Sequence, residues 1–416
     1  MTSSFRNLLH AGLILLPLAA GCSANTAAIG DPQSPYPPPK PPQVGDILHI
    51  PTGYYVDESE MLDAIGDSRI VYVGETHDNP AAHRLELTVL RGVSDRHPGK
   101  VALGMEMFTP SQQDALDRWV AGELSEKEFL KESGWYQQWN MDFALFRDIL
   151  VFARDHDIPI LGLNADKDMV RKVGRQGVEA LSEEERRKVP ELDMDDPYHR
   201  AMTEAIFGDH DSGGNMLESF LRVQTLWDET MAASIADYLS GEDRKDHHMV
   251  VMAGGNHVRF GYGIPRRVFR RLPTSYALVG SREIDIPEDK KDRMMNVDPP
   301  PLPMEPYDYL VYTEYEELET NKAQLGVRFE EIEDGIEVLA IVPESAAAEA
   351  GLKAGDILLS IEGTRLEDSF DLIYEIGQRQ PGDEVMVEYL RDDEKKEITL
   401  TLQEPRHGMK EKHGSK

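Results

Sequence analysis

Two short motifs each place a histidine directly after a run of apolar residues. Arg69–Val73 leads into Gly74-Glu75-Thr76-His77, and Met249–Ala253 leads into Gly254-Gly255-Asn256-His257. An apolar, β-branched run that ends in glycine predicts a buried strand followed by a tight turn. Each histidine then projects at the carboxyl end of its strand, where open α/β sheets bind their ligands. The two matched motifs predict one site assembled from both halves of a domain.

Two other predicted strands also end in polar side chains. Glu106 follows the strand Val101–Met105, and Asn164 and Asp166 follow the strand Pro159–Leu163. Because parallel strands end at the same edge of a sheet, we expect these side chains to converge with the two histidines.

The predicted set supports two kinds of chemistry. His77, His257 and Glu106 suit a divalent metal such as zinc, manganese or iron. The same residues together with Glu75 equally suit acid–base catalysis, with one carboxyl pKa raised by its neighbours. A third alternative is that each residue only caps a helix or ties loops together.

Two helices near the motifs carry further candidates. His83 and Glu86 lie three residues apart on the helix predicted after His77, where they either face the site or form an ordinary surface pair. Asp228, on the helix predicted over Leu217–Leu239, is placed to orient a histidine from behind.

The elements that position these residues alternate between strand and helix from Gly45 to about Thr313. Near-continuous apolar strands separated by amphipathic helices predict an α/β domain with a largely parallel sheet flanked by helices. The polar segment from Gly174 to Gly214 predicts a helical lid insertion. Further strands are expected at Tyr276–Val279 and Tyr309–Tyr312, and helices at Ala81–Val93, Ser111–Val120 and Leu145–His156.

The amino-terminal residues indicate an export signal. The apolar stretch Leu8–Ala20 is too short to span a bilayer and is typical of a secretory signal peptide. It is followed by Cys22, the only cysteine of the chain, in a context that resembles a bacterial lipobox. We expect Cys22 to be lipidated, with an ordinary signal peptide as the alternative. Residues 1–22 are then the signal, and the proline-rich residues 23–45 are a spacer.

These motifs, taken in order, resemble ChaN-like proteins, the haem-binding uptake lipoproteins of the Tiki superfamily. The resemblance covers residues 46–315 and implies haem binding and iron acquisition in a bacterial envelope. Related Tiki, TraB and erythromycin-esterase groups include metal-dependent hydrolases built on the same paired histidines, so a hydrolytic function stays open. The matching segments are Gly74-Glu75-Thr76-His77, Gly104-Met105-Glu106-Met107, Gln224 to Ala232, Gly254-Gly255-Asn256-His257, Gly263-Ile264-Pro265 and Asp308-Tyr309-Leu310-Val311-Tyr312.

Haem binding in this family is linked to tyrosine ligation, and the resemblance implies a tyrosine ligand here. Tyr262 and Tyr198 are the candidates, and His210 in the lid is a further cofactor-binding candidate. No Cys-x-x-Cys-His motif is present, which excludes covalent haem attachment.

Residues 320–404 strongly resemble a bacterial PDZ domain of the type found in envelope proteases. Such a domain, a partly open β-barrel with helices, binds an extended carboxyl-terminal peptide by strand addition. Leu325, Gly326 and Val327 are expected to supply the amides that hold the peptide carboxylate, and Ile373 to line the groove. A polar tail over residues 405–416 follows.

The sequence thus predicts a lipid-anchored envelope protein, in the outer membrane facing the periplasm, that binds haem or iron and recruits a peptide or protein. A metal-dependent hydrolase with a PDZ-recruited substrate is the alternative. The net charge of −32 argues against nucleic-acid binding and against membrane contact other than through the anchor. The oligomeric state is left open.

Overall fold

A computed structural model describes residues 38–139, 141–208, 214–288, 304–318, 323–333 and 335–404. The expected signal peptide, Cys22, His210 and the tail over residues 405–416 lie outside the described residues. Within those ranges, no helix combines the length and apolar character needed to cross a bilayer.

The large domain is built on an eight-stranded sheet in the order β2-β1-β8-β7-β3-β6-β4-β5. Strands β3 to β8 run parallel, whereas β1 and β2 form an antiparallel hairpin at one edge. The strands are β1 (Ile47–His49), β2 (Tyr54–Val56), β3 (Ile70–Glu75), β4 (Val101–Met105), β5 (Ile160–Gly162), β6 (His248–Gly254), β7 (Tyr276–Asp285) and β8 (Tyr309–Glu314).

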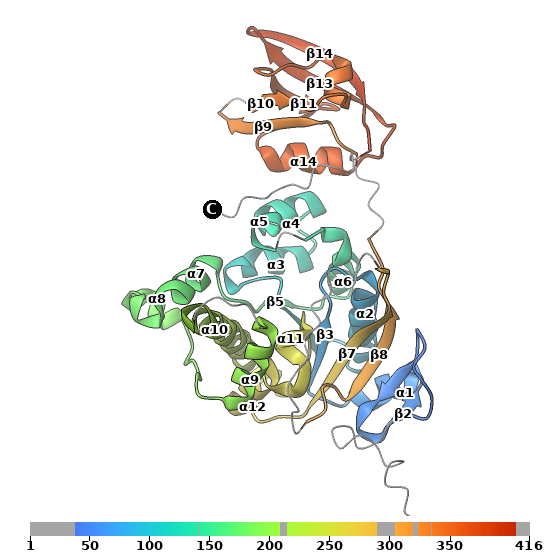
Figure 1. Ribbon diagram of the computed structural model, residues 1–416, viewed down its shortest axis with the longest axis vertical. Coiled ribbons are helices and arrows are strands. Elements are labelled where there is room, and N and C mark those ends of the chain that lie inside the picture. Colours follow the sequence, from blue (N-terminus) through green and yellow to red (C-terminus); the bar gives the residue numbers. More distant parts are fainter. Residues whose placement is uncertain are drawn as a thin grey trace, which may run out of the picture.

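Helices cover both faces of this sheet (Figure 1). Val71 and Val73 of β3 pack in one core with the helices that follow β3 and β4. Ile70 and Tyr72, which point the other way, pack in a second core with α10 and α12. The helices are α1 (Glu58–Ile65), α2 (Pro80–Arg96), α3 (Gln113–Val120), α4 (Glu126–Glu132), α5 (Trp135–Gln138), α6 (Arg147–Asp155), α7 (Lys167–Gln176), α8 (Glu183–Lys188), α9 (Pro197–Phe207), α10 (Gly214–Leu239), α11 (Gly255–Val258) and α12 (Ile264–Arg271).

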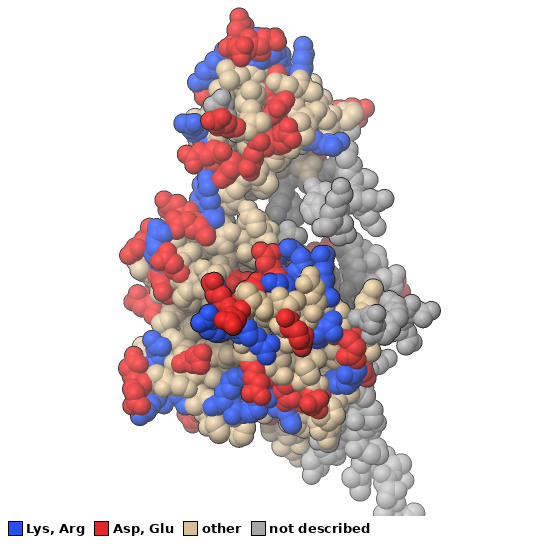
Figure 2. Space-filling view, turned by 90° about the vertical axis from the view of Figure 1, so that its left-hand side faces the viewer, with Lys and Arg blue, Asp and Glu red and all other residues tan. Residues whose placement is uncertain are grey.

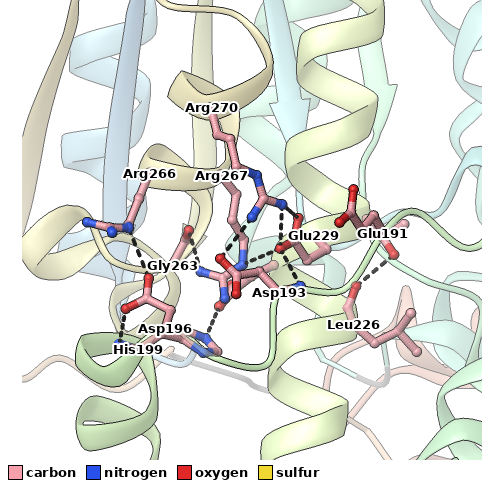
Figure 3. Close-up of polar contacts among 12 residues, drawn as sticks. Glu191, Asp193, Asp196, His199, Leu226, Glu229, Gly263, Arg266, Arg267 and Arg270 are labelled. Atoms are coloured by element: carbon pink, nitrogen blue, oxygen red, sulfur yellow. Dashed lines mark hydrogen bonds and ion pairs between the residues drawn. The ribbon is translucent and has the colours of Figure 1, made fainter. Parts of the chain in front are cut away.

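The predicted lid is helical and is fastened to α12 by ion pairs (Figure 3). Asp196 caps the amino terminus of α9, and its Oδ2 lies 2.9 Å from Nε of Arg266. Asp193 pairs with Arg270 at 2.9 Å. Arg270 also reaches the fully buried Glu229 of α10 at 2.9 Å. These pairs fix α9 against the two helices that approach the predicted site.

The carboxyl-terminal domain is an antiparallel sheet in the order β14-β13-β11-β10-β9, with β12 paired to β11. Figure 1 shows this domain above the large domain, with α14 beside α4 and α5. Phe370 of α14 belongs to a core cluster of the large domain. The elements are β9 (Val327–Ile332), β10 (Gly335–Ile341), α13 (Ala346–Ala350), β11 (Ile357–Ile361), β12 (Thr364–Arg365), α14 (Ser369–Gly377), β13 (Glu384–Arg391) and β14 (Glu394–Thr401).

Acidic and basic side chains are mixed on the face of the molecule that Figure 2 shows. On the face shown in Figure 2, Asp and Glu side chains are interspersed with Lys and Arg instead of forming one patch of a single sign. This distribution is typical of a soluble surface.

Candidate functional site

His77 is held at the end of β3 by the carboxylate that precedes it. Glu75, the last residue of β3, places Oε1 2.6 Å from Nδ1 of His77. The Trp139 ring meets the imidazole edge-on, with the centroids 5.0 Å apart. The His77 side chain is 38% exposed, whereas that of Glu75 is fully buried. One face of the imidazole is therefore open to a ligand while its orientation is fixed from inside.

Glu106 joins His77 to His257 across the ends of β4 and β6. Its Oε2 accepts a hydrogen bond of 2.7 Å from the Gly254 amide, and its Oε1 lies 3.5 Å from Nε2 of His257. A Cβ on Gly254 would lie 2.8 Å from Cε1 of His77 and 3.6 Å from Oε2 of Glu106. Any side chain at this position would therefore collide with the His77 ring.

Asp228 of α10 orients His257 from behind. Its Oδ1 lies 2.6 Å from Nδ1 of His257, and its Oδ2 lies 2.8 Å from Nε2 of His199. His199 comes from α9, so the lid contributes to the site. We call Glu75, His77, Glu106, Asp228 and His257 the strand-end site.

Charge in the strand-end site is balanced between imidazoles and carboxylates. Burial lowers the pKa of His77, but Glu75 opposes burial and raises it to about 9. Burial likewise lowers the pKa of His257, and Glu106 and Asp228 raise it to about 9. Burial raises the pKa of Asp228, but His257 and His199 hold it well below its usual range. At neutral pH both site histidines are therefore protonated in the metal-free protein.

His83 and Glu86 lie behind Glu75 and are buried, which excludes the surface-pair alternative. Nδ1 of His83 lies 2.9 Å from Oε2 of Glu75 and 2.9 Å from Oε2 of Glu86. Burial raises the pKa of Glu75, but His83 and His77 lower it to about 2. Burial and the nearby Glu75 raise the pKa of Glu86 to about 8. We call Glu75, His83 and Glu86 the buried triad.

The other polar residues expected at this edge serve the local backbone. Asn164 accepts a hydrogen bond from the Ala165 amide, and Asp166 accepts one from the Ser111 hydroxyl at 2.7 Å. These contacts hold loops in place, as the alternative to a site role predicted, and Asp166 makes no side-chain cap to α7. His199 was missed by the sequence analysis because it belongs to no motif. The pattern Asp196-Pro197 at the start of an amphipathic helix is the only local signal near it.

The two candidate haem tyrosines lie against each other. The rings of Tyr198 and Tyr262 are stacked, with centroids 4.9 Å apart and an interplanar angle of 12°. Tyr262 is buried in a small cluster with Met202 and Phe260, whereas Tyr198 is 40% exposed. Tyr198 is the more accessible of the two hydroxyl-bearing rings, and Tyr262 lies beneath it.

The expected peptide groove of the second domain has a free strand edge and a free loop. β9 is the last strand of its sheet. Gly326 has φ +82°, and its carbonyl accepts a hydrogen bond from the Val342 amide at 2.9 Å. Among the described residues, the amides of Leu325 and Gly326 donate no backbone hydrogen bond outside the strands. Val327 begins β9, and Ile373 on α14 is 54% exposed.

Other residues of α14 contact the large domain. Lys127 of α4 reaches Asp371 at 3.0 Å and Glu375 at 2.9 Å. The rings of Tyr136 and Phe370 lie 6.3 Å apart. The same short helix therefore borders the presumed peptide groove and joins the two domains.

The fold and site define an α/β domain with paired strand-end histidines, followed by a PDZ domain. Residues 61–268, half of the chain, match the family described as "Haem-binding uptake, Tiki superfamily, ChaN". Residues 323–402 match the PDZ domain family. The chain belongs to the haem-binding uptake, Tiki superfamily, ChaN family, and it carries a PDZ domain.

Several curated proteins are similar to parts of the chain. RETICULATA-RELATED 5, a chloroplastic protein of Arabidopsis thaliana, is 25% identical over 267 residues, which cover 56% of this chain and 34% of that protein. Protease Do-like 1 of the same plant is 37% identical over 91 residues, 19% of each chain. The periplasmic endoprotease DegQ of Escherichia coli is 35% identical over 72 residues, 17% of this chain and 16% of DegQ. The chain thus spans between 16% and 34% of the length of these relatives.

Two solved structures are similar in outline. The ChaN structure of Campylobacter jejuni, described as showing cofacial haem binding, has a TM-score of 0.49 and 13% identity, covering 65% of this chain and 98% of that chain. The HtrA3 PDZ domain bound to a phage-derived ligand has a TM-score of 0.18 and 23% identity, covering 20% of this chain and 86% of that chain.

Proposed function

We propose that the large domain binds haem on the face formed by Tyr198 and Tyr262. Family membership supports haem binding in general. The observation that supports this face is the stacked tyrosine pair, with Met202 and Phe260 packed around Tyr262. A porphyrin needs an apolar surface for its ring and a ligand for its iron.

The residues present fit this group on the exposed side. Tyr198 offers an accessible phenol on the first turn of α9, and the exposed Arg266 nearby carries a charge suited to a carboxylate. Tyr262 reaches the surface only if Tyr198 turns aside, because it is buried beneath that ring. We therefore propose that Tyr198 contacts the haem and that the Tyr262 ring supports Tyr198 from beneath. Bound haem would supply iron for transfer to another carrier.

A haem titration read by absorbance tests the proposal. Tyr198→Phe should weaken binding at least tenfold, about 1.4 kcal/mol, and shift the absorbance bands. Tyr54→Phe is the matched control, because Tyr54 is 71% exposed on β2, far along the sheet order from the site. If the spectrum changes in His257→Ala but not in Tyr198→Phe, the haem binds at the strand-end site instead.

Hydrolysis at the strand-end site is the second candidate. Two histidines, each oriented by a carboxylate at 2.6 Å, lie on either side of Glu106. Such protonated imidazoles can stabilise an oxyanion, while Glu106 can accept a proton from water. His257→Ala should then abolish turnover of a peptide or ester while the fold is kept. His156→Ala, at an exposed position, is the control. Unchanged turnover in His257→Ala would eliminate this candidate.

The PDZ domain is proposed to recruit a peptide or protein carboxyl terminus to either activity. We further propose that Cys22 anchors the protein by a lipid in the bacterial envelope, at the outer membrane facing the periplasm. The apolar stretch before Cys22 supports export and an anchor at this cysteine. Mass spectrometry of the processed amino terminus tests the anchor, and Cys22→Ala should release the protein in soluble form.

A further inference from the structure

The buried triad has more hydrogen-bond acceptors than donors. Oε2 of Glu75 and Oε1 of Glu86 are buried and have no hydrogen-bond partner. Both carboxylates face the same imidazole nitrogen, because Nδ1 of His83 lies 2.9 Å from each. A single ring proton at Nδ1 cannot serve two carboxylates at once. Buried acceptors without partners are rare, and either a proton on Glu86 or a cation between the three side chains would satisfy these.

His83 is arranged as a metal-ligating histidine usually is. Its Nε2 donates to the carbonyl of His77 at 3.0 Å, which leaves Nδ1 to point at the carboxylates. Metal-ligating histidines commonly donate their other ring N–H to a backbone carbonyl in this way. The Phe146 ring, 4.3 Å from that of His83, closes the other side. The ring is thereby fixed in position and in tautomer.

We propose that Glu75, His83 and Glu86 bind a divalent first-row transition ion, Zn²⁺ or Mn²⁺. Nδ1 of His83 and one oxygen each of Glu75 and Glu86 provide three donor atoms and leave the fourth tetrahedral position to a water or another ligand. Among the described residues, this is the set of His, Cys, Asp and Glu whose ligand atoms all lie within 4.8 Å of one another. One imidazole with carboxylates matches the ligand preference of these ions.

The geometry needs only a small adjustment. Ligand atoms around a tetrahedral Zn²⁺ with bonds of about 2.0–2.1 Å lie roughly 3.4 Å apart. The separations of 2.9 Å from His83 to each glutamate must therefore widen by roughly half an ångström, which rotation of the glutamate side chains can supply.

The proposed ion differs from one held by His77, Glu106 and His257, the ligand set expected from the motifs. The ion in the buried triad would lie behind Glu75 and act on His77 only through that carboxylate. The metal-site proposal does not depend on haem binding, so a failed haem titration would not contradict it.

Metal titration of the purified full-length protein tests the proposal. After treatment with a chelator, the protein is titrated with ZnCl₂ and separately with MnCl₂, and bound metal and thermal unfolding are measured. We expect one equivalent of either ion to bind and to raise the unfolding temperature. Glu86→Gln, which keeps the side-chain volume, should weaken binding at least tenfold. His156→Gln, an exposed histidine control, should bind like the wild type.

Three outcomes overturn the proposal. Absence of a stoichiometric ion in the wild type means that protons alone occupy the triad. Binding that survives Glu86→Gln but is lost in His257→Ala places the ion in the strand-end site. If Glu86→Gln does not fold, anomalous X-ray scattering at the zinc edge is used to locate the ion in the wild-type protein. A peak between Glu75, His83 and Glu86 supports the proposal, and a peak elsewhere refutes it.

Discussion

Asp228 is, with Glu106, one of the two carboxylates that keep His257 charged. Its carboxylate joins the imidazoles of His257 and His199, and it is buried with both of them. The pKa of His257 is raised from 6.5 to about 9, so its contribution to stability is fully present below pH 6.5 and is lost as the pH rises through 9. The pKa of Asp228 is lowered, so its contribution is lost only as the pH falls below its usual value of 3.8.

Asp228→Asn should therefore destabilise the metal-free protein at pH 7 by about 1.5–3 kcal/mol, the typical contribution of a hydrogen bond to a charged group. The difference from the wild type should shrink at pH 10, where His257 is neutral in both proteins. Urea unfolding at the two pH values measures it. Asp237→Asn, exposed on the same helix, should show no such dependence. An equal loss at both pH values would mean that Asp228 acts by packing alone.

Gly254 is a second residue on which the geometry of the site depends. Gly254→Ala places a methyl group 2.8 Å from the His77 ring, so the ring must move away from Glu106. Overpacking of this kind costs about 1–3 kcal/mol. NMR spectra should show displaced His77 ring signals, and Gly377→Ala, which meets no atom within 4 Å, should leave them in place. Unmoved His77 signals in Gly254→Ala would contradict the described geometry.

The sequence predicted the residues on the strands better than those that reach the site from elsewhere. Glu75, His77, Glu106 and His257 could be placed together because parallel strands end at one edge. His199 could not, because its place depends on how α9 folds back onto α10. The burial of His83 and Glu86 could not be predicted either. Helical spacing shows that two residues share a face of the helix, but not whether that face is turned to the core or to solvent.

At the scale of elements, the loop before β9 is the feature whose class of ligand can be predicted. Its free amides at Leu325 and Gly326 and the unpaired edge of β9 suit a peptide carboxylate. Peptides with a free carboxylate and an apolar last residue should bind with a Kd on the order of micromolar. Amidation of the peptide terminus should weaken binding about tenfold or more, because the amides lose their anion. Fluorescence anisotropy with matched acid and amide peptides measures the difference.

Gly326→Ala tests the loop itself. The residue has φ +82°, and an added Cβ would lie 2.2 Å from Cβ of Ser345, so the loop must rearrange. Binding of the free-acid peptide should be lost in this variant and kept in Gly377→Ala. Equal binding of acid and amide peptides would show that the groove is no carboxylate receptor.

The elements themselves were mostly foreseen. All six predicted strands of the large domain exist, because long apolar runs bounded by glycine or charge leave few alternatives. The hairpin of β1 and β2 was missed, since strands of three residues carry too little periodicity to be recognised.

At the scale of the whole molecule, the contact between the domains is the main feature that the sequence did not predict. The sequence of α14 does not show whether its aromatic residues pack within their own domain or against the neighbouring domain. In the structure, Phe370 packs with the large domain, and Lys127 and Lys131 of α4 pair with acids of α14. Partly exposed ion pairs contribute only about 0–1 kcal/mol each. The aromatic contact should therefore dominate.

Phe370→Ala should separate the unfolding of the two domains. Truncation of a buried phenylalanine costs about 3–5 kcal/mol, and here part of that loss falls on the contact between domains. Calorimetry should show one cooperative transition in the wild type and two in Phe370→Ala, while 1 M salt, which screens the lysine pairs, should leave the wild type with one. Ile373→Ala is the control, because this residue lies three positions along the same helix but is 54% exposed. If Phe370→Ala and Ile373→Ala unfold alike, α14 does not couple the domains. If salt alone splits the transition, the ion pairs carry the contact.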